Sequence, residues 1–192
     1  MYNYTTDTDV ALTGTKENII RMLNTAMRNA GSDIVIAESD DLETMLQKVK
    51  KVDDNQQFLL PDFLDEKSIQ ECNLQEKQDQ CRHEYRDECY DWVRVHEILN
   101  DGEDYTVKLG AHVHEDVEIF DISDWVNWGN KASRLYQCII TMKSEHYCDG
   151  ELDDTRSFTF APDGEEIQLA SPITIEKVDT KKAEDEGVDL PF

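Results

Sequence analysis

The chain has 192 residues, with 43 Asp or Glu against 19 Lys or Arg, and its formal net charge is −24 at pH 7. Three Trp, seven Tyr and six Phe supply enough bulk for a folded core, because disordered chains are poorer in such residues. The densest group of bases is Lys48, Lys50 and Lys51. Since phosphate contacts need clustered bases, the composition argues against a body that binds nucleic acid or an anionic membrane.

The cysteines and the N-terminal residues bear on the cellular compartment. The five cysteines are Cys72, Cys81, Cys89, Cys138 and Cys148. Their odd number and the absence of a CxxC pair do not fit a secreted disulfide scaffold. Residues 1–7 lack the basic region and the apolar region that a signal peptide contains. No apolar run in the sequence approaches the ~20 residues that a membrane span needs. We therefore expect a cytoplasmic protein.

In the N-terminal half, hydrophobic spacing predicts short strands alternating with helices. The predicted elements are a strand over 9–13, a helix over 15–31, a strand over 34–36 and a helix over 40–49. Thr15 is a suitable cap for the first helix, and Gly31 ends it. Ser39 or Asp40 caps the second helix, and Asp40 followed by Glu43 resembles a capping box.

Two polar segments follow. Residues 52–67 contain Pro61 and predict an irregular connection, which apolar residues hold against the body. These apolar residues are Phe58, Leu59, Leu60, Phe63 and Leu64. Residues 68–89 predict a third helix capped by Ser68, with a narrow apolar stripe that includes Cys81, Tyr85 and Cys89.

After Tyr90 the spacing favours antiparallel strands. Residues 105–113 alternate strictly between apolar and polar, and the turn residues 100–102 predict a hairpin with residues 92–99. Residues 117–128 are compatible with either a strand or a helix. Further strands are predicted over 135–142, 158–160, 167–169 and 173–178. The fold class predicted is α+β: two or three N-terminal helices with short strands, then a mostly antiparallel sheet or small barrel. We expect a domain over 1–178 and a flexible acidic tail over 179–192.

One group of residues is a candidate metal site. His112 and His114 are two apart on a predicted strand and so share one face. His146 and Cys148 repeat that spacing, and two such pairs on adjacent strands would supply four zinc ligands. The alternation of apolar and polar residues offers another explanation for His112 and His114: they lie on the solvent-facing side of a strand whose other side buries Leu109. We therefore assign no metal, and keep these four residues as a weak candidate.

No motif predicts catalysis. The sequence has no GxSxG, no Gly-rich phosphate loop and no HExxH, although a cysteine and a distant histidine can always meet in space. We expect no enzymatic activity and no cofactor. Trp125 and Trp128 would suit a stacking platform for bases, but the net charge favours packing in the core.

The specific signal lies in residues 184–192, Glu-Asp-Glu-Gly-Val-Asp-Leu-Pro-Phe. This ending resembles the acidic C-terminal tip of bacterial single-stranded DNA-binding proteins, in which an acidic run precedes Asp, then Ile or Leu, then Pro-Phe. The match covers only about the last nine residues, and Gly187-Val188 interrupts the acidic run. The family's basic, aromatic OB-fold is not visible in the body.

The resemblance implies a role in recruitment. In that family the tip docks on helicases, nucleases, primase and recombination mediators. The docking residues implied here are Asp189, Leu190, Pro191 and Phe192, with Glu184, Asp185 and Glu186 steering the tip toward a basic rim.

Four hypotheses follow. The leading one is a non-enzymatic adaptor or decoy that docks on DNA replication and repair proteins, and a phage or mobile-element origin would suit it. One alternative is a divergent phage-type single-stranded DNA-binding protein with an OB-like barrel over residues 90–178. The others are an acidic DNA-mimic inhibitor and a metal-dependent enzyme.

Overall fold

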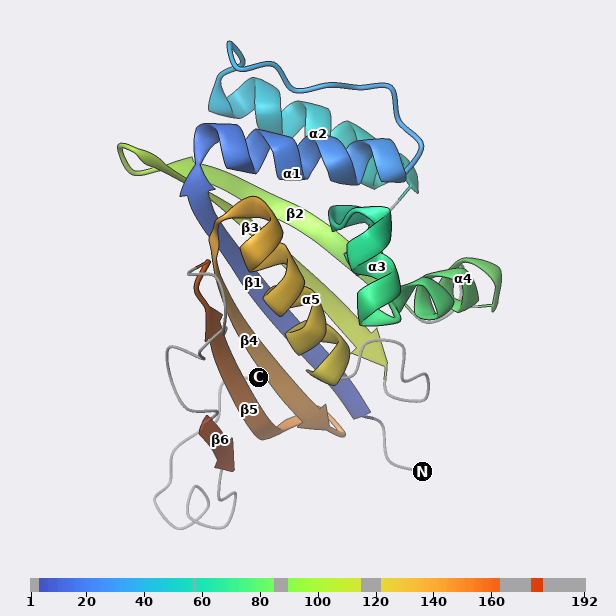
Figure 1. Ribbon diagram of the computed structural model, residues 1–192. Coiled ribbons are helices and arrows are strands. Elements are labelled where there is room, and N and C mark those ends of the chain that lie inside the picture. Colours follow the sequence, from blue (N-terminus) through green and yellow to red (C-terminus); the bar gives the residue numbers. More distant parts are fainter. Residues whose placement is uncertain (1–3, 57, 85–89, 115–121, 163–173, 178–192) are drawn as a thin grey trace.

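The computed structural model describes residues 4–56, 58–84, 90–114, 122–162 and 174–177, and it confirms the α+β class (Figure 1). The elements are β1 (Tyr4–Thr15), α1 (Lys16–Asn29), α2 (Leu42–Gln56), the 3₁₀ helix η1 (Leu60–Phe63), α3 (Glu66–Cys72), α4 (Leu74–Glu84), β2 (Tyr90–Asn100), β3 (Asp104–His114), α5 (Ile122–Tyr136), β4 (Ile139–Cys148), β5 (Glu151–Phe160) and β6 (Thr174–Lys177). None of the described helices is long and apolar enough to cross a membrane.

The described strands form one open antiparallel sheet in the order β2-β3-β1-β4-β5-β6. The N-terminal strand β1 lies in the middle, paired with β3 on one side and β4 on the other. Residues 90–178 therefore do not form a sheet of their own. The alternative of an OB-like barrel over those residues is wrong, because among the described strands β2 and β3 join β4 and β5 only through β1.

Alternation along the strands gives the sheet two different faces. In β1, Val10 and Leu12 are buried, whereas Asp9 between the strand's buried positions is exposed. The apolar face packs against the helices, and α5 runs along it (Figure 1). A Cβ atom added to Gly129 of α5 would lie 2.6 Å from atoms of both Met142 and Phe160. This glycine therefore permits the close approach of α5 to β4 and β5.

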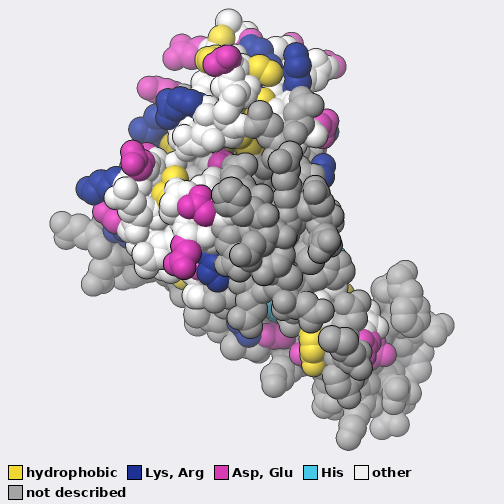
Figure 2. Space-filling model, turned by 90° about the vertical axis from the view of Figure 1, so that its right-hand side faces the viewer, with side chains coloured by type: hydrophobic (Ala, Val, Ile, Leu, Met, Phe, Trp, Pro, Cys, Tyr) yellow, Lys and Arg dark blue, Asp and Glu magenta, His cyan; other side chains and the backbone are white. Residues whose placement is uncertain are grey.

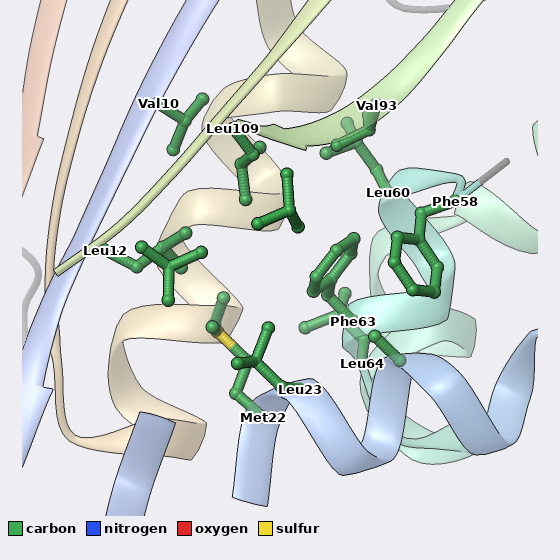
Figure 3. Packing of buried hydrophobic residues seen from close by; sticks show 14 of the residues in the cluster. Val10, Leu12, Met22, Leu23, Phe58, Leu60, Phe63, Leu64, Val93 and Leu109 are labelled. Atoms are coloured by element: carbon green, nitrogen blue, oxygen red, sulfur yellow. The ribbon is translucent and has the colours of Figure 1, made fainter. Parts of the chain in front are cut away.

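The segment between α2 and α3 contributes a large part of the core. The five apolar residues predicted to hold it against the body are fully buried, which confirms that prediction. The ring of Phe58 meets the edge of Phe63 at 5.3 Å between centroids, and Phe63 meets Trp128 of α5 at 6.4 Å. Figure 3 shows Phe63 between Phe58 and the side chains of Met22 and Leu23 of α1.

The predicted strand over 34–36 is wrong. Ile36 is buried in irregular chain, and the side chain of Asn24 in α1 replaces a neighbouring strand. Its Nδ2 donates to the carbonyl of Ile36 at 3.0 Å, and its Oδ1 accepts from the Ile36 amide at 2.8 Å. One amide side chain thus satisfies both backbone groups that a strand partner would satisfy.

The predicted first helix is confirmed, and the second differs at both ends. Thr15 caps α1 by accepting from the amide of Asn18. Asp41, rather than Ser39 or Asp40, caps α2 by accepting from the amide of Thr44 at 2.8 Å. Asp40 instead accepts from Lys48 Nζ, and α2 continues through residues expected to be irregular.

The predicted third helix is two helices. The chain breaks between α3 and α4 at Asn73, whose φ of 54° lies in the left-handed region. Asp65, rather than Ser68, caps α3 by accepting from the Ser68 amide at 2.8 Å. The side chains of the predicted stripe Cys81, Tyr85 and Cys89 lie outside those the structure describes.

In the C-terminal half, the hairpin of β2 and β3 is confirmed. Gly102 turns the chain with a φ of 124°, and its amide donates to Asn100 Oδ1 at 2.9 Å. Residues 122–136 form helix α5, so the strand expected from residue 135 begins only at Ile139. The edge strand predicted over 173–178 is confirmed as β6. The strand over 167–169 and the tail over 179–192 lie outside the described residues.

Candidate functional site

The face of the sheet opposite α1 and α5 is polar, and we call it the open face. It carries Asp7, Asp9, Ala11 and Thr13 of β1, Thr106, Lys108 and His112 of β3, Thr141, Lys143 and Glu145 of β4, and Ser157 and Thr159 of β5. These residues alternate with the buried residues of the same strands, so their side chains point away from the core. Antiparallel sheets often leave one such face to solvent, and this one carries both acids and bases.

A hollow of about 580 Å³ lies in the middle of the open face. Its polar lining comes from Asp9, His96, Lys108, Thr141, Lys143, Ser157 and Thr159. Small residues at the centre explain the hollow, because Ala11 and Gly110 add little or no side chain there. A Cβ atom on Gly110 would lie 2.9 Å from His96 Nε2 and 3.2 Å from Asp9 Oδ1. The imidazole and the carboxylate thus share the space above this glycine.

Both lysines of the hollow form ion pairs with glutamates that lie outside it. Lys108 Nζ lies 3.3 Å from Glu97 Oε2, and Lys143 forms an ion pair with Glu145. The hydrogen bond from Lys143 lowers the pKa of the Glu145 carboxyl below its ordinary value. Tyr147 also donates to Glu145 at 2.8 Å, and this bond raises the pKa of the tyrosine to about 12. The ammonium groups of Lys108 and Lys143 therefore lie at the rim of the hollow.

The structure does not bring the candidate metal ligands together. His112 contacts Asp7 on the open face, whereas His146 Nδ1 lies 2.9 Å from Thr6 Oγ1 on the helix-covered face. The backbones of His114 and Cys148 pair with different residues of β1, which separates their two strands. Within the described residues, no three or more His, Cys, Asp or Glu side chains are arranged to hold a metal ion.

A buried polar group on the helix-covered face was not predicted from the sequence. Thr8 and Ser144 bond through their hydroxyls at 2.8 Å, next to the contact of Thr6 with His146. Asp154 accepts from Arg156 Nε at 3.1 Å on the neighbouring strand. The available signal was the replacement of apolar by hydroxyl residues at alternate positions of β1 and β4. These contacts pair polar groups where the apolar core ends, although Asp154 Oδ1 has no hydrogen-bond partner among the described residues.

The two buried cysteines of the described chain are poor nucleophiles. Burial raises the pKa of the Cys72 thiol to about 11 and that of Cys138 to about 12. The thiolate is the reactive form, so neither side chain supports a cysteine-based catalytic hypothesis. Cys148 is partly exposed.

We expect iodoacetamide at pH 8 to modify Cys148 in the folded protein well before Cys72 or Cys138. Peptide mapping by mass spectrometry after timed labelling measures the three sites separately. Labelling in denaturant is the control, because unfolding should remove the difference between the sites. Fast labelling of Cys138 in the folded protein would contradict its burial.

The tryptophan pair belongs to the core rather than to a binding platform. Trp125 and Trp128 of α5 are 2% and 0% exposed, and their rings pack edge to face at 6.0 Å between centroids. Neither ring is available to stack on a base. The prediction of core packing is confirmed.

Charges of both signs share the described surface. On the coloured part of the face in Figure 2, lysines and arginines lie among aspartates and glutamates rather than in a continuous basic groove. No known protein family, curated protein or solved structure matches this chain. The predicted docking residues, from Glu184 to Phe192, lie outside the described residues.

Proposed function

We propose that the protein is a non-enzymatic adaptor or decoy that docks on DNA replication and repair proteins which recognise the tip of single-stranded DNA-binding protein. The observation that carries this proposal is the ending Asp189-Leu190-Pro191-Phe192, preceded by the acids of residues 184–186. The proposal requires Phe192 to carry the free α-carboxylate.

Each residue of the ending has a physical role in docking. The ring of Phe192 fills an apolar pocket, and its carboxylate accepts a bidentate pair of hydrogen bonds from an arginine. Pro191 limits the conformations of the free chain and so reduces the entropy lost on binding. The upstream acids raise the rate of encounter with a basic pocket rim.

The position of the last described strand is compatible with this role. β6 pairs with β5 at the edge of the sheet and ends at Lys177. At about 3.3 Å per residue, residues 178–192 in extended form would reach roughly 50 Å. A tip on such a segment engages a partner's pocket without requiring the sheet to enter it.

Removal of Phe192 alone is expected to abolish docking. We would immobilise the full-length protein and the variant lacking Phe192, pass host lysate over both, and identify the retained proteins by mass spectrometry. Helicases, primase or repair nucleases retained only by the full-length protein, and released by a synthetic peptide of residues 184–192, would support the proposal.

A matched variant separates the ring from the carboxylate. Adding one glycine after Phe192 keeps the ring and moves the carboxylate, so it is expected to weaken retention strongly. The variant Lys181→Ala leaves the tip unchanged and should retain the same proteins as the full-length chain. Equal retention by all four proteins would reject the proposal and direct attention to the surface of the body.

A further inference from the structure

The charged side chains of the hollow follow an alternating pattern across three adjacent strands. Lys108 lies on β3, Asp9 on β1 and Lys143 on β4. Asp9 pairs directly with Lys143, so their Cβ atoms are roughly 5 Å apart. Lys108 is the partner of Ala11 and therefore lies diagonally from Asp9, at roughly 7 Å. The hollow thus presents a carboxylate between two ammonium groups.

We propose that this hollow binds a small zwitterion of the amino-acid class. The ligand's ammonium group lies on Asp9, and its anionic groups lie on Lys108 and Lys143. A molecule with one ammonium between two carboxylates, such as a dicarboxylic amino acid, matches this order of charges. This site is separate from the tail and does not depend on the docking function proposed above.

The rest of the lining fits the same ligand class. Thr141 and Ser157 offer hydroxyls, which both donate and accept hydrogen bonds. His96 shares the space above Gly110 with Asp9 and adds a second polar group beside the expected ammonium position. The described lining exposes no Phe, Tyr or Trp ring, since Phe158 is buried. The volume is within the usual range for a small-molecule site.

The electrostatic arrangement explains why the site takes a zwitterion rather than a simple anion. An anion alone would meet the repulsion of Asp9 between the two lysines. An ammonium group alone would meet Lys143 directly opposite Asp9 on the next strand. A ligand that carries both charges satisfies all three side chains. Both lysines already form ion pairs with glutamates at the rim, so binding requires each lysine to exchange Glu97 or Glu145 for a carboxylate of the ligand.

The test uses L-glutamate as the probe, followed by two-dimensional NMR of the full-length protein labelled with ¹⁵N. We expect saturable shifts at amides of β1, β3 and β4 around Ala11. Glutarate lacks the ammonium and γ-aminobutyrate lacks one carboxylate, so both should bind more weakly. Asp9→Asn and Lys143→Met should each weaken glutamate binding by about tenfold, the effect of losing one charge-assisted hydrogen bond.

Two controls keep the test decisive. Lys67→Met makes the same change of charge on α3, where the lysine is 87% exposed, and should bind glutamate like the wild type. The variant lacking Phe192 should also bind normally, which separates this site from the tail. Comparison of the amide spectra shows whether each variant is folded. No saturable shift with glutamate, or equal affinity in Asp9→Asn, would overturn the proposal.

Discussion

Replacing Trp128 with alanine is expected to lower the free energy of unfolding by about 3–5 kcal/mol, the usual cost of truncating a buried aromatic residue. Trp128 is fully buried and packs edge to face against both Trp125 and Phe63. Its truncation removes contacts between α5 and the segment that follows α2. Urea unfolding followed by circular dichroism measures the loss.

Two further variants test the cause of that loss. Trp128 Nε1 is buried without a hydrogen-bond partner among the described residues, so Trp128→Phe should cost much less than Trp128→Ala. Val35→Ala truncates a residue that is 64% exposed and should change stability by less than about 0.5 kcal/mol. A loss for Trp128→Ala no larger than that of Val35→Ala would contradict the packing described.

The elements that the sequence predicted best are those in which local pattern and tertiary burial agree. The alternation along residues 105–113 predicted β3 correctly because Val107, Leu109 and Ala111 are buried against the helices. Thr15 predicted the start of α1 because the hydroxyl of an N-cap residue bonds only to an amide in the first turn of the helix that follows it. In both cases the information lies within a few residues of the chain.

The predictions of secondary structure failed where a tertiary contact, outside the segment itself, determines its conformation. Residues 34–36 have strand-like composition, but Asn24 bonds the backbone of Ile36 and removes the need for a neighbouring strand. Residues 117–128 were ambiguous, and their described part begins helix α5, which contacts the sheet, η1 and α3. Local spacing does not encode such contacts on several sides. The central position of β1 was likewise not predicted, since it depends on pairings with β3 and β4, which lie far along the chain.

The open-face hollow shows the same limit for the site. Asp9, Lys108 and Lys143 are unremarkable charged residues in the sequence, and only the register of three strands brings them together. Gly110 offered a weak signal, because a glycine inside an alternating strand often marks a close approach. Here that approach is by the side chains of His96 and Asp9. The docking prediction for residues 184–192 is the opposite case. It rests on a local sequence motif and not on residues that the fold brings together.

Asp53 links the end of α2 to the outer edge of the sheet. It is almost fully buried, and its Oδ1 and Oδ2 accept from the amides of Phe58 and Val95, each at 3.2 Å. β2 is an edge strand, so the Val95 amide would otherwise be an unpaired donor on that edge. Phe58 also forms a bridge with Val93 of the same strand. One carboxylate therefore anchors this segment and closes part of the edge.

Replacing Asp53 with alanine is expected to lower the free energy of unfolding by about 2–4 kcal/mol, because two buried amides lose their acceptor. Asp54→Ala, one residue along on an exposed position, is the matched control and should cost little. Urea unfolding gives the free energies, and light scattering at high concentration tests whether the freed edge of β2 promotes association. Equal stability of the two variants would contradict the anchoring role.

The loss of stability caused by Asp53→Ala is expected to depend on pH. Burial, the largest influence, raises the pKa of Asp53 above its ordinary value, despite the two amide bonds. A carboxyl whose folded pKa is raised gives its full stabilisation below its unfolded pKa of about 3.9 and loses it as pH rises through the folded pKa. The stability gap between wild type and Asp53→Ala should therefore be larger near pH 4 than at pH 7. A gap that grows with pH would show that the amide bonds outweigh burial at this carboxylate.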